Sequence, residues 1–506
     1  MNVINIGFDN SKYLKEQSKS IMDRAAQFGN RLYLEFGGKL LSDYHASRVL
    51  PGFDPNVKLE LLKRLKDKIE VIICIYSGDI ERRKMRADFG IPYDIDTMKL
   101  IDELREGGIN VIAVVVTRFN DQPIVKQFIN KLERRNIKVY THQSIKGYPT
   151  NIDLIVSEEG YGANQYIKTT KPIIIVTAPG PGSGKMATCL SQVYHENQMG
   201  LEAGYAKFET FPIWNLPLKH PVNMAYESAT ADIGDFNQID PFHLETYDIT
   251  AINYNRDVEI FPVVKKIMRR IMGNKLVYKS PTDMGVNMAG FAITNDDLVQ
   301  QAAKQELIRR FFRYSCEYVM GLTEKKTVQK AELLMKELNL SPLDRKVVKK
   351  AREASILSRK KGKGNEGVFA GAALELKDGT IIIGNNSPLM HAASSLILNA
   401  IKELAHIPDE IHLLSPNILR SISTLKSEIF NHKRLSLNLE ETLIALSISA
   451  DFNPSAMVAM EKLKDLKYCE MHSTHIPTPG DEAGLRRLGL NITSDPNFSS
   501  KSLFIP

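Results

Sequence analysis

The chain has 506 residues, of which 43% are hydrophobic and 25% are charged, a composition typical of a globular protein of about three domains. Its net charge of +7 is concentrated between Arg345 and Lys363, where nine lysines and arginines accompany one glutamate. A nucleic-acid-binding protein would spread such charge over a folded face, so we expect no nucleic-acid partner.

Membrane and secretory segments are not expected either. No apolar run approaches the roughly 20 residues that span a bilayer. The N-terminal stretch MNVINIGFDNSKY lacks the basic and apolar parts of a signal peptide. The four cysteines are scattered without a C-x-x-C pair, which argues against a disulfide framework or a cysteine zinc site. We therefore expect a cytoplasmic protein with no membrane partner.

Short apolar runs alternate with amphipathic segments through the first 210 residues. Several runs are β-branched throughout, as in strands that are covered on both faces. The pattern predicts an α/β domain over 1–256 with a mostly parallel sheet. The candidate strands are 31–36, 70–77, 110–119, 138–142, 153–157, 172–177 and 204–211.

Strand patterns disappear between residues 257 and 358, where long amphipathic segments predict a helical middle domain. The basic segment that ends this region is interpreted as a solvated helix face followed by a flexible linker over 358–366; a phosphate-binding arm is the alternative. Strand patterns return in GVFAGAALELKDGTIIIGNN, which predicts a hairpin and opens a third domain, 359–506, of α/β class.

The stretch TAPGPGSGKMATCL (177–190) follows a candidate strand and precedes a predicted helix. A Walker A loop reads G-x-x-x-x-G-K-[ST]; its amides cradle phosphates and its lysine reaches the terminal ones. Here Pro179 replaces the first glycine and Met186 replaces the magnesium-binding hydroxyl, which Thr188 could supply instead. The alternative is a structural glycine turn. The residues predicted to bind phosphates are Gly180, Gly182, Ser183, Gly184, Lys185 and Thr188.

The spacing from Lys185 to Thr188 is similar to the P-loop of CTP synthetases, where GLGKGIT follows a strand. A lysine-bearing strand and an acidic stretch come next in both. The resemblance implies ATP or another nucleotide with Mg²⁺ as the cofactor. Because magnesium on a nucleotide takes one or two carboxylates, Asp232 and Asp235 are candidate ligands, with an acidic surface loop as the alternative.

Other polar residues follow the first two candidate strands. Lys39 comes after the first strand, and Asp79 and Arg82 come after the second. Ligands of open parallel sheets bind beyond the carboxyl ends of the strands, so these side chains are candidates for a substrate pocket. For each residue alone, a turn or a solvated helix start is the alternative.

The C-terminal third resembles the cytidine deaminase-like fold in the order GAALELKDGTIIIGNN, His391-Ala392-Ala393 and SADFNPSAMVAMEKL. Aligned by spacing, the essential glutamate is Ala393, and Ser455 and Val458 replace both zinc-binding cysteines. Deaminase chemistry needs these groups, so no zinc and no deamination are expected. A metal-free pocket with Asn386, His391 and Ser455 is one interpretation; a packed helix start is the other.

Over nearly its full length the chain resembles a bacterial family of roughly 500-residue cytosolic proteins classed as a domain of unknown function. PGPGSGK, YESATADIGDFNQIDPFHLETY and TPGDEAGLRRLG are the most specific stretches. The family implies a multidomain α/β architecture and transfers no activity. Two hypotheses follow: an ATP-dependent ligase or phosphotransferase acting on a small metabolite, or a non-catalytic regulator that binds a nucleotide or metabolite. A homo-oligomer is compatible with either.

Overall fold

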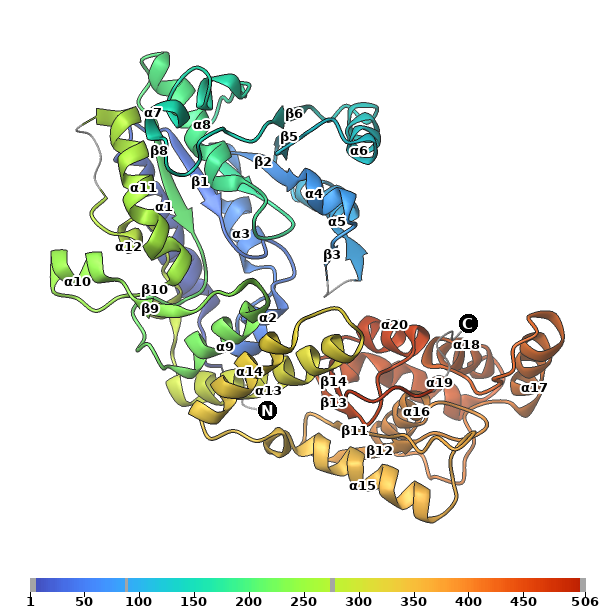
Figure 1. The fold of residues 1–506 in the computed structure, drawn as a ribbon. Coiled ribbons are helices and arrows are strands. Elements are labelled where there is room, and N and C mark those ends of the chain that lie inside the picture. The colour runs from blue at the N-terminus through green and yellow to red at the C-terminus, as the bar shows by residue number, and fades with distance from the viewer. Residues whose placement is uncertain (1–5, 87–89, 274–277, 501–506) are drawn as a thin grey trace. The chain divides into compact units, whose positions relative to one another are not determined.

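The computed structural model describes residues 6–86, 90–273 and 278–500, and the chain divides into two compact units (Figure 1). The first unit is Met1–Ala303 and the second is Lys304–Pro506. The predicted boundaries at 256 and 358 do not coincide with this division. Of the helices predicted for a middle domain, α11 (Asn255–Met272) lies in the first unit and α15 (Lys346–Lys360) lies in the second.

The first unit contains a six-stranded sheet in which all neighbouring strands are parallel, in the order β6-β5-β2-β7-β1-β8. The central strands are buried along their length, which explains their continuous apolar sequence. The predicted parallel α/β class is therefore confirmed for this unit. The strands are β1 (Leu32–Phe36), β2 (Ile69–Tyr76), β5 (Val111–Thr117), β6 (Val139–His142), β7 (Ile173–Thr177) and β8 (Gly204–Phe208).

One predicted strand, 153–157, is wrong. The segment forms the short helix α7 (Ile152–Ile155) instead, because the side chain of Asn151 accepts a hydrogen bond from the backbone N–H of Leu154 and caps the helix. The apolar residues in this segment therefore belong to a helical turn rather than to a seventh strand of the sheet.

Helices between the strands complete the layers of the first unit. Asp9 caps the first of them by accepting from the N–H groups of Ser11 and Lys12, and α8 packs against β1, β7 and β8. Helices α5 and α6 lie beside the β2, β5 and β6 side of the sheet. The helices are α1 (Asn10–Ala26), α2 (Tyr44–Val49), α3 (Val57–Arg64), α4 (Ser77–Glu81), α5 (Tyr93–Glu106), α6 (Pro123–Glu133) and α8 (Lys185–Gln198).

After β8 the first unit continues with short elements. The acidic stretch forms a two-stranded antiparallel ribbon, β9 with β10, before the long helix α11, which packs against α7 and α8. A second small ribbon, β3 with β4, precedes α5. These elements are β3 (Met85–Arg86), β4 (Ile91–Pro92), α9 (Pro221–Ala229), β9 (Asn237–Ile239), α10 (Pro241–Tyr247), β10 (Ile252–Tyr254) and α12 (Pro281–Met284).

The second unit contains a four-stranded sheet in the order β12-β11-β13-β14, with β11 antiparallel to both neighbours and β13 parallel to β14. Helix α13 begins just before the unit boundary. The elements are α13 (Asp296–Val319), α14 (Lys325–Glu337), β11 (Gly371–Glu375), β12 (Ile381–Asn385), α16 (Ala392–Leu404), α17 (Pro416–Thr424), α18 (Leu439–Ala450), α19 (Pro454–Glu461), β13 (Glu470–Ser473), α20 (Pro479–Arg487) and β14 (Asn491–Ser494).

The basic segment 345–363 belongs to this second unit. Arg345 is 1% exposed and donates to the carbonyls of Met471 and Asn491 at 2.9 and 2.8 Å, which attaches the start of α15 to β13 and β14. Exposed lysines lie along the first turns of the helix and again at its other end, at Lys360, Lys361 and Lys363. The interpretation of 358–366 as a linker between domains is wrong, because the segment joins α15 to β11 and these two elements pack against each other.

Among the described helices, none combines the length and the apolar character that crossing a bilayer requires.

Candidate functional site

The glycine loop Ala178–Gly184 connects β7, a central strand, to the start of α8 at the carboxyl edge of the sheet. Gly182 and Gly184 have φ angles of +72° and +85°, which favour glycine. A Cβ on Gly184 would lie 2.9 Å from Cγ2 of Thr117, and one on Gly180 would collide with the ring of Tyr93. Close packing by β5 and α5 therefore fixes the conformation of the loop and leaves room only for glycine at positions 180 and 184.

Two carbonyl groups of the loop are bonded to residues at the end of β5. Thr117 Oγ1 donates to the carbonyl of Ser183 at 2.8 Å, and the guanidinium of Arg118 donates to the carbonyl of Gly182. In a trans peptide the N–H of the next residue points in the direction opposite to the carbonyl group. The N–H groups of Ser183 and Gly184 are consequently directed away from β5.

Several donors of the loop have no acceptor within the part of the chain that the structure describes. The backbone N–H groups of Gly184 and Lys185 donate to no protein acceptor there, and the first amides of any α-helix lack partners inside the helix. The hydroxyl of Ser183 is buried, and among the described residues it too has no hydrogen-bond partner. The loop therefore presents donors that suit an anion at the start of a 14-residue helix.

Lys185 begins α8, but its side chain does not project into solvent as its position after the loop predicts. The side chain is 11% exposed, and Nζ lies 4.0 Å from Oε1 of the buried Glu35 on β1. The other oxygen of Glu35 accepts from the hydroxyl of Tyr205 at 2.6 Å. The lysine thus lies at the junction between the loop and a buried carboxylate.

Thr188 is fully buried between α8 and β2, and its hydroxyl lies 3.4 Å from Sγ of Cys74. One turn into the helix, this side chain packs against the sheet. The placement does not favour Thr188 as a substitute for the magnesium-binding hydroxyl of a Walker A loop, since it gives the oxygen no access to a ligand in solvent.

A buried charged cluster that the sequence interpretation did not include lies beside Glu35. Lys207 on β8 bonds to both carboxylate oxygens of Asp257 at 2.6 Å, to Glu209 at 3.2 Å and to the hydroxyl of Tyr254. The position of Lys207 in the apolar strand GYAKF was the sequence feature that could have identified it.

The cluster shifts the ionisation of its members. Burial acts to lower the pKa of Lys207, but the charges of Asp257 and Glu209 outweigh it and raise the pKa. Burial also raises the pKa of Glu209, to about 7; Lys207 lowers it, while Asp257 adds to the increase. Glu209 is therefore a largely buried carboxyl, 14% exposed, whose pKa lies near neutral pH.

Tyr93 packs against Gly180 of the loop. Its pKa is raised to about 12, by burial first and then by the negative charges of Asp79 and Asp232. Asp79 is buried and is paired at 2.5 Å with the mostly exposed Arg82, whereas Asp232 is exposed.

Asp235 and Lys39 have structural contacts instead. Asp235 is buried; its Oδ2 accepts from Nη2 of Arg256 at 2.7 Å and its Oδ1 lies 2.5 Å from Nε of the same arginine, so its charge is already compensated. The carbonyl of Lys39 accepts from Nζ of Lys58 at 3.0 Å just beyond β1. Within the described residues, no group of three or more His, Cys, Asp or Glu side chains is arranged to bind a metal ion.

The C-terminal candidates are placed differently from the expectation. No strand lies between α16 and α19; the strand paired with β11 is β13, and the helix that follows it is α20. The partner of His391 comes from α20, where Oδ2 of Asp481 lies 2.7 Å from Nδ1 of the histidine. The alignment of Ser455 with a deaminase ligand is therefore wrong, because α19 does not follow the paired strand.

Asp481 is also bonded to the starts of two other segments. Its carboxylate accepts from the N–H of Leu439 at 2.9 Å and from the hydroxyl of Thr478 at 2.7 Å. Asn386 has both ends of its amide bonded to backbone groups, at Val368 and Ala370. The predicted pocket residues Asn386 and His391 are thus engaged by the protein itself.

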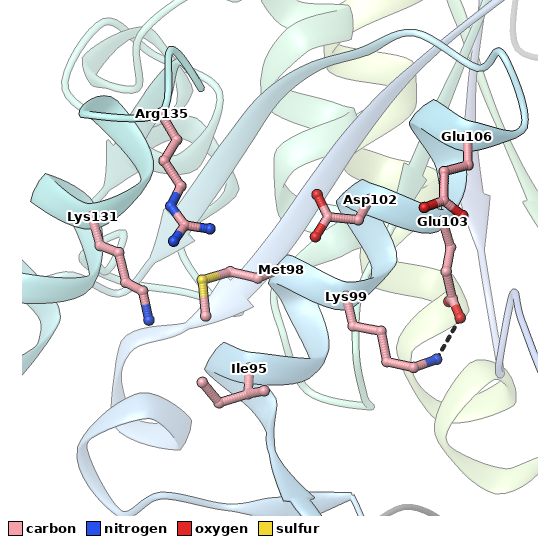
Figure 2. A pocket seen from close by; sticks show the side chains of 8 residues that line it. All are labelled: Ile95, Met98, Lys99, Asp102, Glu103, Glu106, Lys131 and Arg135. Carbon is pink, nitrogen blue, oxygen red and sulfur yellow. Dashed lines mark hydrogen bonds and ion pairs between the residues drawn. The ribbon is translucent and has the colours of Figure 1, made fainter.

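A surface hollow of about 420 Å³ lies between α5 and α6, away from the glycine loop (Figure 2). Figure 2 shows acidic side chains of α5 on one wall and Lys131 and Arg135 on the other, with Lys99 bonded to Glu103 at 2.5 Å. None of the predicted site residues lines it. The hollow is open and charged, and it is separate from the site at the edge of the sheet.

Comparison with known proteins places the chain in a family. A family model described as "Domain of unknown function DUF1846, N-terminal" matches residues 6–339, and its C-terminal counterpart matches residues 343–504. The chain belongs to the DUF1846 family. UPF0371 proteins of Clostridium botulinum strains Alaska E43 / Type E3 and Kyoto / Type A2 are each 57% identical to it over 499 residues, which is 99% of both chains. The UPF0371 protein of strain 657 / Type Ba4 is 56% identical over the same length.

The expected membership of a bacterial family of about 500 residues is thus confirmed. The two DUF1846 models meet between residues 339 and 343, just before α15, whereas the compact units of the structure meet inside α13. Neither boundary separates the helices of the middle region as a domain of their own.

Proposed function

We propose that the carboxyl edge of the N-terminal sheet binds a phosphorylated small molecule, with ATP or another nucleotide as the first candidate. The observation that carries this proposal is a set of donors in the glycine loop that have no acceptor among the described residues: the N–H groups of Gly184 and Lys185 and the buried hydroxyl of Ser183. Backbone donors at a helix N-terminus are the usual phosphate ligands of P-loops and dinucleotide-binding loops.

Lys185 would supply the positive charge. Its contact with Glu35 is long, at 4.0 Å, so exchange of this carboxylate for a phosphate requires little rearrangement. For Mg²⁺ we propose Asp232, the exposed member of the predicted pair, without Asp235, because Arg256 already compensates the buried Asp235. A carboxylate would then supply the protein ligand for Mg²⁺ that neither Met186 nor the buried Thr188 provides.

Both a catalytic and a regulatory role are compatible with this site. The buried cluster of Lys207 and Glu209 beside the loop favours an ATP-dependent ligase or phosphotransferase, because a carboxyl that titrates near pH 7 suits general acid–base chemistry. The missing hydroxyl ligand for magnesium favours a regulator that only binds. In either case we propose a small-molecule ligand and no nucleic-acid or membrane partner; a homo-oligomer is compatible with both roles.

Isothermal titration with ATP, with and without Mg²⁺, tests the proposal. Wild-type protein should bind, and Lys185→Met should not. Because this change leaves Glu35 without its cation, the double variant Lys185→Met with Glu35→Gln serves to separate lost binding from lost stability. Binding of ATP to both variants as tightly as to the wild type would refute the proposed site.

Two glycines give a matched pair for the loop itself. Gly182 and Gly200, at opposite ends of α8, have φ angles of +72° and +75°, and at neither would a Cβ meet another atom within 4 Å. The two alanine substitutions should therefore lower the free energy of unfolding by the same amount. Gly182→Ala should also weaken ATP binding, whereas Gly200→Ala should leave ATP binding unchanged. ADP release measured over a panel of metabolites would then distinguish an enzyme from a regulator.

We also propose that the protein acts in the cytoplasm, since all four cysteines are free and buried as thiols.

For the C-terminal domain we propose a deaminase-like fold without zinc. The sheet order β12-β11-β13-β14 and the position of α20 after β13 support it, with Asp481 next to His391 where a metal-binding helix would start. Metal analysis of purified protein should find no stoichiometric zinc; one zinc per chain that is lost in His391→Ala would contradict this.

A further inference from the structure

Arg118, at the end of β5, is placed over the glycine loop by an unusual local structure. Its φ angle is +51°, a left-handed conformation that is uncommon for a residue other than glycine. Its carbonyl accepts from the hydroxyl of Ser77 at 2.7 Å, which fixes this backbone conformation. Non-glycine residues in this region are concentrated at ligand sites, where the surrounding structure compensates the strain.

The side chain of Arg118 is positioned as well as its backbone. The guanidinium carbon lies 3.4 Å from the centroid of the Tyr76 ring, so the planar group stacks on the aromatic face while the residue as a whole is exposed. The same guanidinium donates to the carbonyl of Gly182. An arginine that is stacked, exposed and already in contact with the loop has further N–H donors available for a phosphate.

We propose that Arg118 is a second phosphate-binding cation of the loop, and that the site is specific for ligands with two or more linked phosphates. This inference rests on the proposed function. In the conformation described here the guanidinium donates to Gly182; with ligand it turns its remaining donors to the phosphate farthest from Lys185.

The specificity for linked phosphates follows from the positions of the two cations. Lys185 extends toward Glu35 on β1, while Arg118 reaches the loop from β5. The strands that carry Glu35 and Arg118 are three places apart in the order β5-β2-β7-β1, roughly 14 Å at a spacing of about 4.8 Å, so the two cations reach the loop from different sides. A chain of two or three phosphates reaches both cations more readily than a single phosphate does.

Titration of three inorganic probes tests the proposal without knowledge of the natural ligand: orthophosphate, pyrophosphate and tripolyphosphate. Arg118→Gln should weaken tripolyphosphate binding by about 10- to 100-fold, the usual effect of losing a charge-assisted hydrogen bond, and should leave orthophosphate binding unchanged. Arg118→Lys, which keeps the charge but loses the planar fork, should be intermediate. Arg105→Gln, an exposed arginine near the far end of α5, is the control and should bind like the wild type.

The outcomes separate this inference from the proposed function. If the wild type binds none of the probes or ATP, both fail. If the wild type binds tripolyphosphate and Arg118→Gln binds it equally well, only the role of Arg118 is refuted. An equal loss for orthophosphate and tripolyphosphate would also overturn it, because this is the effect of a residue that merely supports the loop. Should Arg118→Gln not fold, the same comparisons apply to Arg118→Lys.

Discussion

The glycine loop before α8 and the junction around Asp481 are two helix starts that the protein treats in opposite ways. In the loop, the N–H groups of Gly184 and Lys185 have no acceptor among the described residues. At the junction, the carboxylate of Asp481 accepts from Leu439 at the start of α18 and from Thr478 at the start of α20, and it bonds to His391 before α16.

The difference shows how the same local dipole can serve stability or binding. Helix N-termini favour negative charge, and the C-terminal domain supplies that charge from its own sequence. At the glycine loop no carboxylate of the described residues accepts from the free N–H groups, even though Glu35 lies close to Lys185. We therefore propose a mainly structural role for the Asp481 junction and a ligand-binding role for the glycine loop.

The largest effect expected from this comparison is the loss of Asp481. Asp481→Ala removes three hydrogen bonds of a buried carboxylate, each contributing about 1 kcal/mol, so the free energy of unfolding should fall by about 3 kcal/mol. Urea denaturation would measure it. Glu482→Ala is the control. The carboxylate of Glu482, the residue next to Asp481, forms only a half-exposed ion pair with Arg486, so its loss should change the free energy of unfolding by less than about 0.5 kcal/mol. Equal effects of the two changes would remove the distinction between the two helix starts.

Gly184→Ala should have the next largest effect. The left-handed backbone alone costs about 1 kcal/mol, and here the new methyl group also collides with Thr117, so we expect a loss of about 2 kcal/mol and no phosphate binding. Gly200→Ala shares the backbone conformation without the collision and should lose only about 1 kcal/mol. Thermal unfolding and ATP titration of the two variants provide the comparison; a stable, binding Gly184→Ala would show that the loop is not tightly packed.

The buried Glu209 predicts a pH dependence of stability. Its pKa is about 7 in the folded protein, whereas the ordinary value of a glutamate, expected in the unfolded chain, is about 4.5. Between these two pH values the folded state therefore binds more protons than the unfolded state does. The stability that this group contributes is complete below about pH 4.5 and is lost as pH rises through 7. Relative to Glu209→Gln, the wild type should lose at least about 1 kcal/mol between pH 5 and 7.5. Parallel stability curves for the two proteins would contradict the shifted pKa.

The smallest effect concerns the basic end of α15. Lys360, Lys361 and Lys363 are exposed, so trypsin should cut there first under native conditions, giving fragments of about 40 and 16 kDa from the 56.9 kDa chain. Because α15 and β11 pack within one unit, the fragments should stay together in size-exclusion chromatography and separate only on a denaturing gel. Fragments that separate in native buffer would restore the interpretation of 358–366 as a linker. If saturating ligand slowed the cut, the alternative of a phosphate-binding arm would gain support.

The sequence by itself determined the parallel sheet and the position of the glycine loop. β-Branched runs such as Ile173–Thr177 form buried strands in almost any α/β context, and glycines before a helix start mark the loop wherever the strand lies. Both features depend on local preferences, which the chain carries within a few residues. The wrong prediction at 153–157 is also a local matter, because the capping residue Asn151 outweighs the strand preference of the apolar run.

Only the tertiary structure decided which side chains meet. Arg118 reaches a loop 64 residues away, Glu209 and Asp257 converge on Lys207, and the partner of His391 is 90 residues further along the chain. Thr188 faces Cys74 on β2 rather than the loop, because this side of α8 is turned toward the sheet. Strand order and helix packing bring these residues together, and neither is encoded in spacing along the chain. The sequence therefore located the glycine loop at the edge of the sheet, and the fold selected the residues that surround it.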